Sequence, residues 1–202
     1  MNVETNVKAG QLEGRRTMMK TTLAKFGVLA GSLVFAGSLM FAGGTHEEDP
    51  PGLAQVVALD ECDPGSFNEK LGPDFCKNVA IGAATSFKDL FAKAHAGTPD
   101  RGWDFEPDTV RIRKGTILSV VDQGGEPHTF TEVEQFGGGF ISGLNAPGEN
   151  TVPECAGGFS NVAVAKTRIL QGSQLQITGL SRGEHRFQCC IHPWMRTEVE
   201  VK

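Results

Sequence analysis

The chain has 202 residues and a net charge of −5, with 19 Lys and Arg against 24 Asp and Glu. This size allows one domain, or one domain with a small appendage, and excludes a large multidomain enzyme. No basic cluster lies outside the first 25 residues, so we do not expect a nucleic-acid partner. The 5 His and 5 Cys leave room for one small metal site but not for a multinuclear centre built from many imidazoles.

The first 44 residues have the order of an export signal. Arg15 and Arg16 precede an uncharged run of apolar and small residues over 26–42, and a small-residue cleavage site follows at 42–44. A twin-arginine signal and a Sec signal are both compatible with this segment, and an uncleaved membrane anchor is the alternative. We therefore expect a periplasmic or otherwise exported protein, anchored to a membrane only if the segment stays uncleaved.

The next two segments differ in composition from the rest of the chain. Residues 45–52 are acidic and Pro-rich, which is typical of a linker. Over 53–100 we expect an extension that consists of a loop tied by a disulfide between Cys62 and Cys76, followed by an amphipathic helix. Apolar residues at helical spacing predict this helix within 79–96, and Gly97-Thr98-Pro99 ends it.

Residues 101–202 form a copper domain in this interpretation, and their pattern is that of a mainly β fold. Short alternating runs separated by Gly and Pro predict a β-sandwich. The seven predicted strands are Thr109–Arg113, Ile117–Asp122, His128–Val133, Val162–Ala165, Leu175–Thr178, His185–Cys189 and Thr197–Val201. The Gly-, Pro- and Asn-rich stretch over 134–159 is too long for a hairpin loop, and such stretches are either disordered or functional.

Residues that can bind a metal gather near the C-terminus. A thiol, an imidazole and a thioether, from Cys189, His192 and Met195, lie within seven residues. Successive strand residues face opposite sides, so Cys189 and Cys190 point in opposite directions. A tight turn after His192, at Pro193, can bring His192 and Met195 round to the Cys189 sulfur. Three metal ligands therefore come from one loop.

The fourth candidate ligand is His128, which follows Pro127 at the start of a predicted strand. One thiolate, two imidazoles and a weak thioether form the ligand set of a type 1 copper site for electron transfer. Zinc more often has four strong ligands with paired Cys at fixed spacing. The sequence therefore predicts one copper ion bound by His128, Cys189, His192 and Met195.

Residues 109–131 and 183–202 resemble the single-domain cupredoxins, the blue copper proteins of the plastocyanin, pseudoazurin and amicyanin group. The Cys-x-x-His-x-x-Met spacing with Pro after the His is especially similar to that of amicyanin. The resemblance implies a Greek-key cupredoxin β-sandwich, the same four copper ligands and one-electron transfer. We expect His192 to reach solvent as the electron exit, with Trp194 either in the core or at a docking rim.

The chain departs from this group in its thiols and in one polar residue. Asp122 stands where the group commonly has Asn, and Cys190 where it usually has no thiol. Five Cys fit two disulfides and one metal thiolate, and Cys155 is the available partner for Cys190. A vicinal disulfide between Cys189 and Cys190, which would destroy the metal site, is the alternative.

These observations predict an exported blue copper protein that carries single electrons between a donor and an acceptor redox protein. It would have no small-molecule substrate and would not be an enzyme, because a single domain lacks the second copper centre of nitrite reductases and multicopper oxidases. The alternative is a copper-binding carrier or buffer. The lack of Met or His clusters beyond the four ligands counts against that function. A cupredoxin fold that has lost its metal is a further alternative.

Overall fold

The computed structural model describes residues 52–77 and 84–202, so the predicted export signal and nearly all of the predicted linker lie outside the described residues. The strands in the described part are β1 (Leu53–Leu59), β2 (Asp104–Glu106), β3 (Thr109–Ile112), β4 (Ile117–Asp122), β5 (His128–Thr129), β6 (Thr131–Val133), β7 (Arg168–Ile169), β8 (Gln174–Ile177), β9 (Gly183–Gln188) and β10 (Arg196–Val201). The helices are α1 (Pro64–Leu71), α2 (Phe87–His95) and α3 (Val162–Lys166), with 3-10 turns η1 (Ser142–Leu144), η2 (Pro153–Cys155) and η3 (Gly158–Ser160).

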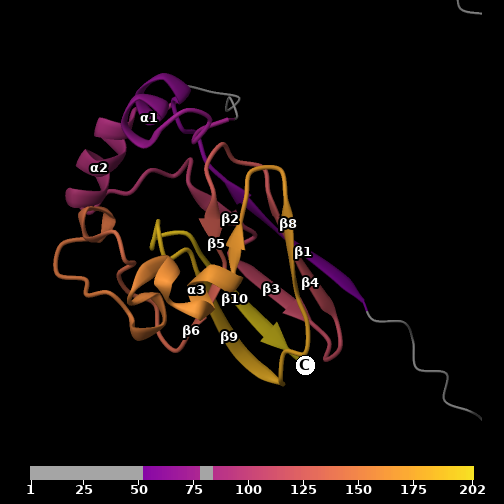
Figure 1. The fold of residues 1–202 in the computed structure, drawn as a ribbon. Coiled ribbons are helices and arrows are strands. Elements are labelled where there is room, and N and C mark those ends of the chain that lie inside the picture. The colour runs from indigo at the N-terminus through magenta and orange to yellow at the C-terminus, as the bar shows by residue number, and fades with distance from the viewer. Residues whose placement is uncertain (1–51, 78–83) are drawn as a thin grey trace, which may run out of the picture. The chain divides into compact units, whose positions relative to one another are not determined.

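Two four-stranded sheets form the body of the fold (Figure 1). Their strand orders are β2-β1-β4-β8 and β3-β10-β9-β6, and β5 pairs with β7 beside them. Neighbours within a sheet are seldom consecutive in the chain, since β1 pairs with β4 and β3 with β10, both in parallel. The chain therefore crosses repeatedly between the sheets, as in Greek-key connectivity. The expected mainly β sandwich is confirmed.

Alternation of apolar and polar residues explains strand β3 of the second sheet. In β3, Val110 and Ile112 are buried while Thr109 and Arg111 are exposed, because successive side chains of a strand face opposite sides. Aromatic rings fill the space between the sheets. Phe130, which separates β5 from β6, stacks on Phe187 with ring centroids 4.4 Å apart.

The first described strand, β1, corrects the predicted boundary between the extension and the copper domain. Residues 53–59 belong to the first sheet, where Val56 pairs with Val120 and β1 runs parallel to β4. The pattern was missed because residues 53–59 are apolar except for Gln55, so the sequence does not alternate, although Val56 and Ala58 are buried and Gln55 is exposed. The sandwich therefore begins at residue 53 rather than at 101.

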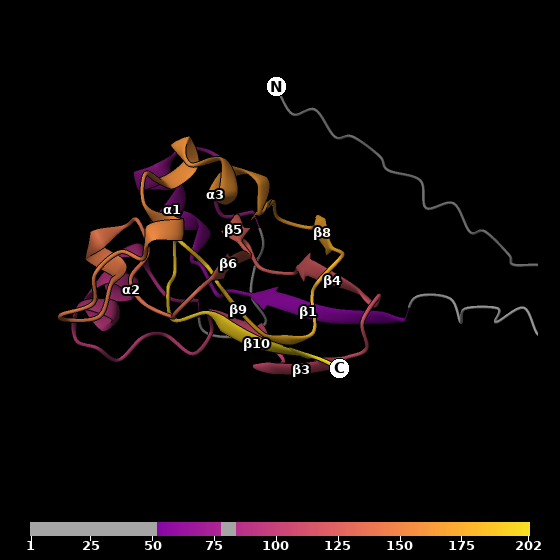
Figure 2. The ribbon, with the colours of Figure 1, turned by 90° about the horizontal axis from the view of Figure 1, so that it is seen from below.

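The expected helical, disulfide-tied extension lies over residues 60–100. Cys62 and Cys76 form the predicted disulfide and enclose α1, a helix that was not predicted. The second helix begins at Phe87 with Ser86 as its N-cap, and the predicted residues 79–83 lie outside the described residues. Figures 1 and 2 show α1 and α2 together at the end of the sandwich away from the C-terminus.

Residues 162–165 form helix α3, not the predicted strand. The Asn161 side chain accepts a hydrogen bond from the backbone N–H of Ala163, and this cap starts the helix despite two Val residues. Residues 134–159 contain three 3-10 turns and follow a defined path. The Asn145 side chain holds both the N–H and the carbonyl of Gly139, at 2.8 and 3.2 Å. None of the helices in the described residues could cross a membrane, because each is too short or too polar.

Candidate metal centre

Three of the four predicted ligands meet in the core between β5 and the loop that follows β9. The Nδ1 atoms of His128 and His192 each lie 3.9 Å from Sγ of Cys189, and all three side chains are buried. In a trigonal plane, a metal ion with a metal–sulfur bond of about 2.3 Å and a metal–nitrogen bond of about 2.0 Å would hold the sulfur and the nitrogen about 3.7 Å apart. The donor atoms are therefore already spaced for a single ion.

Backbone hydrogen bonds shape the loop that carries three of the predicted ligands. The N–H of Cys189 donates to the carbonyl of Met195 at 3.0 Å, and the N–H of Met195 donates to the carbonyl of His192 at 3.0 Å. Met195 is fully buried. Its role as the axial ligand stays a prediction, which the closed loop supports by fixing its backbone to that of Cys189.

Two backbone N–H groups point at the Cys189 sulfur. They come from Thr129 and His192, each 3.5 Å from Sγ. Burial raises the pKa of the Cys189 thiol, but hydrogen bonds and charges from His128 and His192 outweigh it and hold this pKa well below its ordinary value. The site therefore favours the thiolate, which is the form that binds a metal.

Two buried carboxylates hold the outer nitrogens of the histidine rings. Nε2 of His128 lies 3.0 Å from Asp60 Oδ2, and Nε2 of His192 lies 3.1 Å from Glu126 Oε2. Asp60 also accepts the N–H of Glu126 at 2.9 Å and that of Cys62 at 3.2 Å. An N–H bond from Nε2 to a carboxylate leaves Nδ1 free to face the sulfur and fixes the ring orientation.

Sequence reasoning did not identify either carboxylate as part of the site. Glu126 stands two residues before His128, so its place beside a ligand was a usable signal. Asp60 gave no such signal, because His128, which it contacts, is 68 residues away in the chain. Burial is again the largest influence on its pKa and raises it, yet the hydrogen bond and charge of His128 outweigh burial and lower the pKa of Asp60.

Asp122, the residue that replaces the expected Asn, is also buried near His128. Its Oδ1 accepts the N–H of Gly124 at 2.9 Å. Burial is the main cause that raises the pKa of this carboxyl to about 7, although the charge of His128 lowers it. Asp122 therefore shapes the turn before His128.

His192 does not reach solvent, so the expectation that its ring edge is exposed is wrong. Its side chain is 2% exposed, and the rings of Trp103 and Trp194 lie 6.3 and 5.6 Å from it. Burial lowers the pKa of His192, but Cys189 and Glu126 together raise it to about 9. Trp103 contributes to this burial and also stacks against Phe67 of α1 in the extension.

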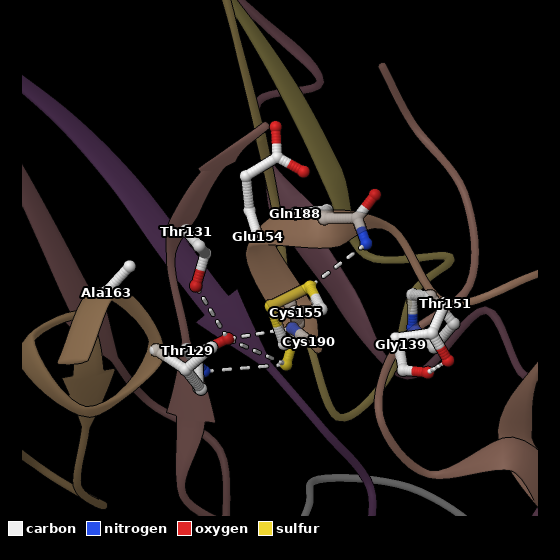
Figure 3. Close-up of a disulfide and its surroundings, with 12 residues drawn as sticks. Thr129, Thr131, Gly139, Thr151, Glu154, Cys155, Ala163, Gln188 and Cys190 are labelled. Atoms are coloured by element: carbon white, nitrogen blue, oxygen red, sulfur yellow. Dashed lines mark hydrogen bonds between the residues drawn. A yellow bond between two sulfur atoms is a disulfide. The ribbon is translucent and has the colours of Figure 1, made fainter. Parts of the chain in front are cut away.

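The second disulfide joins Cys155 to Cys190, as predicted, and the vicinal alternative is wrong. Among the described residues, Cys189 is the one free cysteine, and its side chain faces the histidines while that of Cys190 faces away. Figure 3 shows this disulfide beside Thr129, whose Oγ1 accepts the N–H of Cys190 at 2.7 Å. The disulfide therefore anchors the loop over 134–159 to the loop that carries the predicted ligands.

Comparisons with known proteins return structural likenesses only. No family model matches the chain, and no curated protein matches it. A purple cupredoxin from Nitrosopumilus maritimus is 15% identical, with a TM-score of 0.38 over 74% of this chain and 99% of that one. A reduced amicyanin with one residue substituted is 16% identical, with a TM-score of 0.31 over 49% of this chain and 73% of that one. Likenesses this distant assign no role to any residue here.

The two four-stranded sheets form a β-sandwich, and its buried core holds a His–Cys–His group. A buried thiol with two imidazoles suits a soft or borderline transition metal, whereas Mg²⁺ and Ca²⁺ prefer oxygen ligands. The residues present therefore fit the copper that the sequence predicted.

Proposed function

We propose that this protein is an exported type 1 copper protein that carries single electrons between redox partners and has no substrate of its own. The observation that supports it is the arrangement of Cys189, His128 and His192, with both Nδ1 atoms 3.9 Å from one buried sulfur. Met195 is proposed as the weak fourth ligand. Copper, when bound, supplies the Cu(II)/Cu(I) couple.

The residues around the ligands favour electron transfer over copper carriage. Both histidine rings are held from behind by buried carboxylates, and Pro127 and Pro193 stiffen the two ligand loops. A rigid site changes its geometry little when the metal gains an electron, so the reorganisation energy of electron transfer is small. A copper carrier must instead release its metal, which a rigid and fully buried site opposes.

The first experiment tests which thiol binds the metal. We expect copper-loaded protein to have an intense visible sulfur-to-copper charge-transfer band, which Cys189→Ser abolishes. The matched variant Cys190→Ser should keep the band, because its sulfur faces Cys155. The reverse pattern would refute the ligand assignment.

The second experiment separates the electron carrier from the copper carrier. We expect reversible one-electron cycling without loss of copper, and nearly unchanged ligand distances in both oxidation states by X-ray absorption. Copper that leaves on reduction, or that passes to an acceptor protein under mild conditions, would instead favour the carrier or buffer.

A further inference from the structure

Trp194 is the residue through which the buried site reaches the surface. His192 is too deeply buried to touch a partner, but the Trp194 ring lies 5.6 Å from it and is itself half-buried. Trp194 also lines two adjoining surface hollows. The Trp194 ring therefore lies between the buried His192 ring and the protein surface.

The two hollows at Trp194 continue into two more. Trp194 and Arg196 line both of the first pair, and Phe136 joins that pair to a third hollow. Glu134 and Glu154 join the third hollow to the fourth. Because each hollow shares side chains with the next, the four form one continuous surface, which we call the Trp194 face.

The Trp194 face is strongly acidic. Asp104, Asp108 and Glu198 lie beside Trp194 itself. Five more carboxylates follow along the other hollows, from Glu132, Glu134, Glu149, Glu154 and Glu184. The basic residues that line these hollows are Arg196 and Arg186, together with His185.

This concentration of charge sets the face apart from the remaining described residues. It holds 8 of their 19 Asp and Glu but 2 of their 14 Lys and Arg, so with neutral His it carries −6 while the rest carries +1. Both arginines are already engaged, Arg196 with Glu149 at 3.0 Å and Arg186 with Glu184 at 3.2 Å. Asp104 shows the crowding of charge, because burial and then repulsion from Asp108 and Glu106 raise its pKa.

We propose that the Trp194 face docks a redox protein with a basic surface, and that Trp194 carries the electron between that partner and the metal site. This inference rests on the proposed function. One electron leaves the reduced partner, which is oxidised by one unit, and Cu(II) becomes Cu(I); no atom or proton is transferred. Complementary charge speeds the encounter and fixes its orientation, and an aromatic centre with a polar rim is typical of transient interfaces.

The first test measures docking without any redox step. Cytochrome c serves as a basic protein probe, and NMR follows the backbone and the Trp194 indole N–H of the isotope-labelled protein, both as isolated and copper-loaded. We expect shifts confined to the Trp194 face. Binding should weaken as ionic strength rises from about 0.02 to about 0.2 M, because salt screens exposed charges.

Charge reversal beside Trp194 gives the decisive comparison. The double variant Asp108→Lys/Glu198→Lys should weaken binding of cytochrome c about 10-fold or more. The matched control Glu69→Lys/Asp74→Lys reverses two exposed carboxylates that do not line the hollows, and should weaken binding much less. Equal effects of the two double variants, or shifts that map elsewhere, would overturn the proposed docking surface.

The second test concerns the route of the electron. At saturating cytochrome c, where differences in affinity no longer matter, Trp194→Leu should slow electron exchange while the visible spectrum changes little. An unchanged rate would overturn the role of Trp194. A protein that never cycles with any mediator would instead refute the proposed function, and the binding comparison would still decide whether the face docks basic proteins.

Discussion

Replacing Asp60 should weaken both the fold and the metal site, because this carboxylate joins the extension to His128. Asp60→Ala leaves three buried donors without their acceptor, namely His128 Nε2 and the N–H groups of Glu126 and Cys62. Each orphaned buried donor costs about 1–3 kcal/mol, and loss of one partner of a buried pair costs about 3–5 kcal/mol. We therefore expect the free energy of unfolding to fall by about 4 kcal/mol, out of the roughly 5–15 kcal/mol typical of a domain.

The conservative variant Asp60→Asn separates charge from shape. Its carbonyl oxygen can take the place of Oδ2 and still accept from His128 and Glu126, so we expect a loss of about 1–2 kcal/mol. Urea unfolding of the metal-free protein measures this loss. Zinc, a redox-inert probe, should bind about 10- to 100-fold more weakly, as is usual when a residue that orients a metal ligand is removed.

The matched control is Asp74→Asn, at an exposed residue with a positive φ of 59° that suits Asn equally well. It should change neither the urea midpoint nor the zinc affinity. If Asp60→Asn and Asp74→Asn behave alike in both measurements, the carboxylate does not hold the His128 ring and the reasoning is wrong.

Three further predictions concern the second disulfide, the extension and the core. Replacing both Cys155 and Cys190 by Ser opens a loop that the disulfide closes over a sequence separation of 35. Because the open loop gives the unfolded chain more conformational entropy, the free energy of unfolding should fall by about 4 kcal/mol, as measured in urea. A much smaller loss would contradict this reasoning. Asp100→Asn should destabilise the protein near neutral pH, because burial raises the pKa of the Asp100 carboxyl but its hydrogen-bond partners lower it overall. The wild type should therefore be more stable than the variant above about pH 4, and this difference should vanish as the pH falls through the lowered pKa. Thermal unfolding between about pH 7 and about pH 3 measures the difference, and a difference that stays constant with pH would refute the prediction. Phe130→Ala should cost about 3–5 kcal/mol in urea, because the ring packs in the core between Phe105 and Phe187.

The sequence was sufficient for several strands of the sandwich. β10 alternates in burial and begins one residue earlier than predicted, whereas β4 is buried along most of its length and lies over Ile117–Asp122 as predicted, between Gly115 and Gly124. The pattern failed for β1, whose residues are apolar on both faces apart from Gln55, and for residues 162–165. There a local cap at Asn161 outweighed the strand preference of Val162 and Val164.

The site was predictable where it depends on neighbours in the chain. Cys189 and His192 lie three residues apart, and strand alternation was enough to separate the free thiol of Cys189 from Cys190. The surroundings of the site were not predictable, because Asp60 and Trp103 reach it through tertiary packing of the extension. The same packing explains why His192 is buried, which no local pattern indicates.

The residues that build the candidate centre come from positions 60 to 192, so metal affinity is a measure of the whole fold. A ligand that binds only the folded state stabilises it by about 2.7 kcal/mol when present at 100 times its dissociation constant. Asp60 and His192 lie in segments that the fold must bring together, so a fragment that starts at residue 101 would lack Asp60. Loading with metal should therefore protect amide hydrogens from exchange in β1 as well as in β9, at opposite ends of the described chain.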